Sequence, residues 1–250
     1  MKKIAFLLVA AAATFAMGLK PYVLVDAGMT FPKFSMSIDA AASGGLNQGL
    51  DMTFGPPTNN SGFVGTVGFG LRAPVTEQLD VDASAGLTYA SLGMNSKVDV
   101  SGPVSTSGGI MQVQGKEDME FSFSSKLFDL SAGLDYHLTP QFAVEAGAIL
   151  TVPLSSSMDT KVAVTSISAC TSTGTCTQGG AQPARTTSGT LKSDQTFFSI
   201  KLGGEFNATE RLGLTAEYDL PVANYFDETT DYSVLKASFS RALVGIKYNL

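Results

Sequence analysis

The stretch LDVDASAGLTY, residues 79–89, alternates between two kinds of side chain without a break. Its odd-numbered positions are apolar or aromatic, and its even-numbered positions are acidic, hydroxylated or glycine. Successive side chains of a β-strand point to opposite faces, so a repeat of two residues indicates a strand with two different faces. This stretch therefore predicts a β-strand with one apolar and one polar face.

The same repeat of two recurs seven more times after residue 20, with Ile149 as an exception in its segment. The further segments are residues 23–31, 63–72, 128–137, 142–152, 198–206, 212–220 and 241–250. An even number of antiparallel strands allows a sheet to close on itself. The sequence predicts an all-β fold, an eight-stranded antiparallel up-and-down barrel.

Short and long connections alternate between these segments. The short ones are residues 73–78, 138–141 and 207–211, and the long ones are residues 32–62, 90–126, 153–196 and 223–240. A transmembrane barrel has short turns at one rim and long outer loops at the other, with both chain ends at the short-turn rim. Near Phe121, Phe123, Leu235 and Phe239 the apolar side chains occupy the alternate positions that are polar in the neighbouring segments. We interpret this reversed apolar phase as strand extensions above the membrane with a bulge or register change.

The composition of the two faces predicts which one points into the barrel. Charged residues and glycines share one face, as expected for a narrow interior in which small residues must alternate with large ones. Aromatic residues gather at both ends of the apolar face, as in the girdles at two membrane interfaces. They are Tyr136, Phe142, Phe206 and Tyr248 at the short-turn ends, and Phe31, Phe63, Tyr89, Phe128 and Phe198 at the other ends. A transmembrane barrel is therefore favoured over a soluble, lipocalin-like carrier.

The N-terminus has the order of a secretory signal. Lys2 and Lys3 precede an apolar stretch that is shorter than the roughly 20 residues a spanning helix needs. Small residues follow at Ala16 and Gly18, and cleavage after either fits. We predict a signal peptide over residues 1–18 and one outer-membrane barrel domain over residues 19–250.

The end of the chain, residues 242–250, alternates apolar positions, with Tyr248 third from the end and Leu250 last. It resembles the C-terminal strand that the barrel-assembly machinery reads, although such strands usually end in Phe. With the signal and the eight strands, the chain is similar to small bacterial outer-membrane barrels of the OmpA/OmpX and opacity types. That resemblance implies a place in the bacterial outer membrane, with membrane lipid and the assembly machinery as partners.

The net charge and the cysteines indicate which partners and cross-links to expect. The net charge is −6, and loss of Lys2 and Lys3 with the signal would leave −8, so nucleic acid is not an expected partner. Cys170 and Cys176 lie close together in an exported chain, which predicts a local disulfide. A metal site would need more ligands, and no cofactor is expected.

The polar face supplies the candidate functional residues. We predict an interior charge network of Asp26, Arg72, Asp80, Asp82, Asp135, Glu145, Lys201, Glu205, Glu217, Arg241 and Lys247. Folding about the short turns predicts three cross-strand pairs: Arg72 with Asp80, Lys201 with Glu217, and Asp135 with Glu145. Paired carboxylates could act as general acid and base, but a structural polar network with Lys201, Lys247 or water is favoured.

Two functions remain open from the sequence. The first is a non-enzymatic surface protein whose long loops, rich in Ser, Thr, Gly and Asn, contact other cells, host molecules or the envelope. The alternative is a narrow, porin-like channel for small solutes or cations, similar to the OmpW-type barrels. It is motivated by nine inward carboxylates against four cations, once Asp129 and Asp219 are added to the interior charge network.

Overall fold

The computed structural model describes residues 18–38, 51–55, 58–106, 109–171, 174–191, 195–223, 226–229 and 233–250. The predicted signal peptide lies outside these residues, apart from Gly18, and remains a prediction. In the part of the chain that is described, no helix has the length and apolar character needed to cross a membrane.

Eight antiparallel strands form a closed ring, and β1 and β13 pair to complete it. In ring order they are β1 (Lys20–Ile38), β4 (Gly62–Pro74), β5 (Leu79–Thr106), β6 (Gly109–Thr139), β7 (Phe142–Thr171), β10 (Phe197–Asn207), β11 (Leu212–Pro221) and β13 (Ser233–Asn249). The predicted eight-stranded antiparallel barrel is confirmed.

Five short strands pair with β5, β7 and β13 where these strands continue beyond the barrel. β2 (Asp51–Phe54) and β3 (Thr58–Asn60) pair with β5, whereas β8 (Cys176–Gly179) and β9 (Arg185–Leu191) pair with β7. β12 (Phe226–Thr229) pairs with β13. All five therefore extend the ring strands on the side of the predicted long connections.

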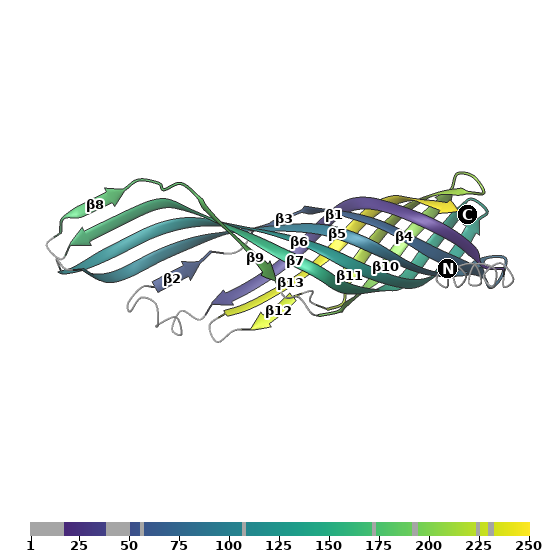
Figure 1. The fold of residues 1–250 in the computed structure, drawn as a ribbon, viewed down its shortest axis with the longest axis horizontal. Helices are drawn as coiled ribbons and strands as arrows, with labels where there is room; N and C mark the ends of the chain where they lie inside the picture. The colour runs from purple at the N-terminus through teal and green to yellow at the C-terminus, as the bar shows by residue number, and fades with distance from the viewer. Residues whose placement is uncertain are drawn as a thin grey trace, which may run out of the picture.

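The three short turns lie at one rim, together with both ends of the barrel chain (Figure 1). Leu250 N donates to Pro21 O at 3.0 Å, which ties the C-terminus to the start of β1. A threonine hydroxyl accepts backbone N–H bonds in each turn, as when Thr209 Oγ1 accepts from Leu212 N at 3.0 Å. These side-chain bonds hold tight turns in place without longer loops.

Three of the predicted long connections are wrong, because residues 90–126, 153–196 and 223–240 are largely strand. β5, β6 and β7 contain 28, 31 and 30 residues, whereas a strand needs about 9–11 residues to cross a bilayer. Figure 1 shows the three strands continuing far beyond the barrel as one twisted sheet. Ser- and Thr-rich composition indicated a loop, but cross-strand pairing of β5 with β6 runs without interruption to Thr106 opposite Gly109.

The predicted strand extensions and a register shift are present, but the shift is not what reverses the apolar positions. Phe123 and Leu127 are buried on the same inward face of β6 as Asp129, so β6 keeps its phase. A register shift does occur at Lys126/Leu127, where β7 carries Leu154 as an extra residue. The apolar residues reverse because the barrel interior itself changes from charged to apolar along β6.

The apolar face of each ring strand points outward. Val67, Leu87 and Val244 are more than 60% exposed in the isolated chain, and most of the predicted girdle aromatics are exposed as well. Exposing such a continuous apolar surface to water is unfavourable in free energy, whereas contact with lipid hydrocarbon is not. The protein is therefore a transmembrane β-barrel of the bacterial outer-membrane type.

The lipid-facing assignment predicts a strong effect at Val67. Val67→Lys puts a charge near the middle of β4 on the outer face and should destabilise the folded barrel by about 2 to 4 kcal/mol. Val75→Lys, in the exposed short turn, should cost less than about 1 kcal/mol. Urea unfolding from lipid vesicles measures both. Equal costs at the two positions would contradict the assignment.

Candidate functional site

The structure places the interior charge network inside the barrel. Its eleven residues, with Asp129 and Asp219, all lie on the inward face, and all except the half-buried Glu217 are buried. The ring of strands brings together residues that are far apart in the sequence. Isolated buried charges are unfavourable, so the contacts between them determine what this interior can do.

Arg72 is the centre of a first cluster. Its guanidinium bonds Glu205 on β10, directly across the ring, with Nη1 to Oε1 at 3.2 Å. It also lies 2.8 Å from Asp135 and 3.8 to 3.9 Å from Asp82 and Asp80. One arginine therefore links strands on opposite sides of the lumen, and the lumen is blocked at this level.

Lys247 and Tyr22 complete the first cluster. Lys247 Nζ lies 2.9 Å from Glu205 Oε2 and 4.6 Å from the centre of the Tyr22 ring. The Tyr22 hydroxyl donates to Asp82 Oδ1 at 2.6 Å. The Tyr22 ring packs over Gly70, where an added Cβ would come within 2.1 Å of it. Sequence reasoning missed Tyr22 because the first strand was taken to begin at Val23, although Tyr22 is in phase with the polar face.

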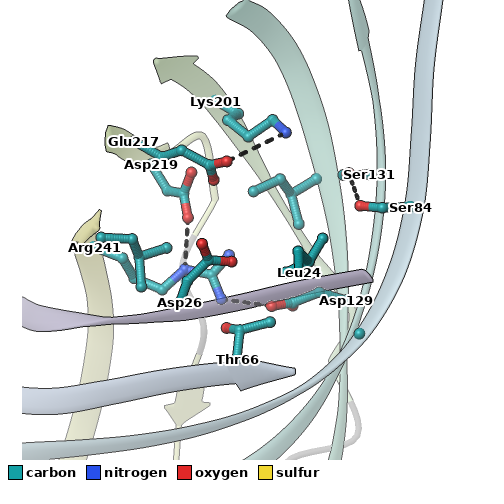
Figure 2. Close-up of a pocket in the computed structure, with 13 residues that line it drawn as sticks. Leu24, Asp26, Thr66, Ser84, Asp129, Ser131, Lys201, Glu217, Asp219 and Arg241 are labelled. Carbon is teal, nitrogen blue, oxygen red and sulfur yellow. Dashed lines mark hydrogen bonds and ion pairs between the residues drawn. The ribbon is translucent and has the colours of Figure 1, made fainter. Parts of the chain in front are cut away.

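Arg241 is the centre of a second cluster, shown in Figure 2. Its Nε donates to Asp219 Oδ2 at 2.8 Å and its Nη1 to Asp129 Oδ2 at 2.7 Å. Asp129 also accepts hydrogen bonds from Thr88 at 2.7 Å and Thr151 at 2.6 Å. Asp129 is therefore well matched by donors, although it was not among the residues of the predicted network.

Lys201 forms ion pairs with two more carboxylates of the interior. It contacts Glu145 directly and lies 3.9 Å from Glu217 Oε1. Asp135 is opposite Glu145 in the β6–β7 register, as predicted. Since Arg72 contacts Asp135 and Lys201 contacts Glu145, each member of this carboxylate pair is held by a cation. The arrangement is that of an ionic lock between strands.

The registers predicted for the other two pairs are wrong by two residues, although Arg72 with Asp80 and Lys201 with Glu217 still form ion pairs at 3.9 Å. Arg72 is opposite Asp82, and Lys201 is opposite Asp219. Both turns are centred one residue later than the symmetric folding assumed. A shift of two residues leaves each side chain on the same face, which is why the charges still meet inside the barrel.

His137 lies at the short-turn rim of the interior. Its Nε2 is 2.9 Å from Asp80 Oδ2, and its side chain is partly exposed. Within the described ranges, no group of three or more His, Cys, Asp or Glu side chains is arranged to hold a metal ion.

An apolar cluster fills the barrel on the outer side of the charged residues. It consists of Val64, Ala90, Leu92, Met94, Phe123, Leu127, Phe197, Phe239 and Leu243. The rings of Phe197 and Phe239 meet edge to face with centroids 5.7 Å apart. The interior therefore has two zones, a charged zone toward the short turns and an apolar zone toward the extended sheet.

The Cys170–Cys176 disulfide is present and lies apart from both zones. The two cysteines face each other where β8 pairs with β7, in the extended sheet. The bridge closes only a short hairpin, so it acts locally on the extension.

Removal of Arg72 tests the ionic lock. Arg72→Met should destabilise the barrel by about 3 to 5 kcal/mol, because Asp135 and Glu205 lose a buried partner. Arg72→Met combined with Asp135→Asn should recover part of that loss. Lys161→Met removes an exposed ion pair with Glu120 and should cost less than about 1 kcal/mol. Urea midpoints give all three values, and a small cost for Arg72→Met would contradict the lock.

Comparisons with known proteins give only distant likenesses. No family model matches the chain, and no curated protein sequence matches it. Among solved structures, Neisserial surface protein A is similar at 11% identity and a TM-score of 0.40, covering 92% of this chain and 97% of that one. Ail of Yersinia pestis, crystallised with a heparin analogue, has 10% identity, a TM-score of 0.32 and coverages of 92% and 99%. The Escherichia coli outer membrane protease OmpT has 9% identity, a TM-score of 0.30 and coverages of 92% and 97%.

Proposed function

We propose that this protein is a non-enzymatic outer-membrane scaffold that displays the extended β5–β6–β7 sheet for contact with surfaces or molecules outside the cell. The observation that carries the proposal is the length of these three strands, about three times what a bilayer crossing requires. At roughly 3.3 Å per residue, some 20 residues of each strand reach about 60 Å beyond the membrane. Most of the sheet is therefore available for recognition.

The extended sheet offers a polar recognition surface. Asn95, Lys97, Asp118, Glu120 and Lys161 are exposed on one face, and they come from three neighbouring strands. Gly55 and Thr58 join them around a cavity of about 470 Å³. Paired strands hold these side chains in a defined pattern, which costs less ordering entropy on binding than a free loop would.

The interior supports a scaffold rather than the alternative of a channel. Arg72 and Glu205 bridge the lumen in the charged zone, and the apolar cluster fills it in the outer zone. An eight-stranded barrel is just wide enough to be filled by its own side chains. A solute path would require both zones to be rearranged.

The filled interior predicts negligible ion conductance. Purified protein in planar bilayers should show no stable current steps, because both zones of the lumen are occupied by side chains. A 16-stranded porin inserted from the same detergent serves as the positive control. Stable cation-selective steps that Glu145→Gln or Asp135→Asn reduces would contradict the scaffold and favour the channel.

The display role is tested by shortening the sheet at one level. Ser96 is opposite Met119, Met119 is opposite Val162, and Val162 is opposite Arg185. These four residues form a row across the extended sheet. Two cuts just beyond the row would leave every remaining strand paired except β2, whose partner residues 98–101 on β5 are removed.

Replacing residues 97–118 and 163–184 with Asn-Gly turns should preserve the barrel and abolish adherence of expressing cells to host cells or matrix proteins. The double variant Glu77→Gln/Glu210→Gln alters only the short-turn rim and should adhere like wild type. Outer-membrane insertion is checked by surface labelling and by the heat-dependent gel mobility of the folded barrel. Unchanged adherence of a correctly inserted, shortened protein would overturn the display role.

A further inference from the structure

A cavity of about 40 Å³ lies in the charged zone of the barrel (Figure 2). Charged side chains of Asp26, Asp129, Glu217, Asp219, Lys201 and Arg241 line it, together with hydroxyls of Thr66, Ser84 and Ser131. Since one water needs roughly 10 to 15 Å³ of such space, the cavity has room for about three particles of that size. It is polar and large enough to be occupied.

The charges around this cavity do not balance. Two cations face four carboxylates, and both cations are already engaged: Arg241 with Asp129 and Asp219, and Lys201 with Glu145 outside the lining. Among the described residues, Asp26 receives one hydrogen bond, from Thr215 at 3.2 Å, and no ion pair. Glu217 approaches a cation only at 3.9 Å, from Lys201. The carboxylates around the cavity therefore outnumber the cations of the protein that face it.

A buried oxygen without a partner lies at the same place. Asp219 is 1% exposed, and its Oδ1 has no hydrogen-bond partner within the described chain, while its Oδ2 binds Arg241. Figure 2 shows the carboxylates of Asp26, Glu217 and Asp219 around one common space. An unsatisfied buried carboxylate oxygen is costly, so a ligand that contacts it would stabilise the fold.

Gly245 leaves space for the Asp26 carboxylate to reach the cavity. The Asp26 side chain crosses over Gly245 to reach Thr215 on β11, and a Cβ at position 245 would lie 1.7 Å from Asp26 Oδ1. This close approach over β13 places the Asp26 carboxylate at the wall of the cavity. The backbone of the barrel thus makes room for an oxygen ligand at this site.

We propose that the cavity binds one small monovalent cation of the sodium class together with one or two water molecules. Carboxylate and hydroxyl oxygens are suitable ligands for a hard cation, and the bound charge offsets the excess of carboxylates. The carboxylates are not gathered closely enough to hold a metal ion directly, within the described residues. Water must supply part of the coordination, and the cavity has too little space for the waters that would complete the six or more ligands of a divalent ion, which favours a monovalent one.

The test compares folding stability in different salts. Protein refolded from urea into lipid vesicles in NaCl should have a higher urea midpoint than protein refolded in N-methylglucamine chloride at the same ionic strength. Above the dissociation constant, each tenfold rise in Na⁺ should raise the folding equilibrium constant about tenfold. Equal midpoints of the wild-type protein in the two salts would overturn the proposal.

Matched variants test whether the Na⁺ dependence of stability comes from this cavity or from another part of the protein. Asp26→Asn/Glu217→Gln should lose the Na⁺ dependence, whereas Asp118→Asn/Glu120→Gln, with the same charge change on the extended sheet, should keep it. A Na⁺ response that persists in the cavity variant would place the ion elsewhere and overturn the proposal. If the double cavity variant does not fold, Asp26→Asn alone should show a reduced response, and an undiminished one would contradict the site.

Discussion

Closure of the ring is the constraint on which the rest of the structure depends. In hydrocarbon no water is available for backbone N–H and C=O groups, so an open sheet edge cannot lie in the membrane. β1 and β13 remove that edge by pairing from Tyr22 opposite Asn249 to Ile38 opposite Ser233. Once the ring is closed, each residue faces either lipid or the lumen, and a slip of one residue would turn the charged face into the lipid.

The narrow lumen explains why glycine and charge alternate on the inner face. A ring of eight strands leaves space for large side chains only where their neighbours are small. Tyr22 lies over Gly70, and Asp26 lies over Gly245. These glycines are the counterparts of particular large side chains on adjacent strands, and so they determine where the charged groups lie.

The repeat of two residues predicts the ring, the short turns and the inward face, because lipid and lumen impose opposite polarity on alternate positions. It does not predict how far β5, β6 and β7 extend, since beyond the membrane both faces of a sheet tolerate Ser, Thr and charged residues. It also leaves the register uncertain by two residues, as at Arg72, because such shifts preserve the pattern. The meeting of Arg72 with Glu205, 133 residues apart, depends on the width of the ring and lies beyond any local pattern.

The apolar cluster connects the barrel to the sheet that it displays. Leu92 and Met94 of β5 and Phe123 of β6 lie where these strands leave the ring, and they pack with Phe197 of β10 and Phe239 of β13. β10 begins at this level, with Phe197, so the cluster joins the base of the extended sheet to the opposite wall by side-chain packing. The same residues separate the charged zone beneath from the water outside the cell, and the lower dielectric of this filled interior strengthens the ion pairs. The interior that closes the lumen is therefore also what gives the external sheet a fixed base.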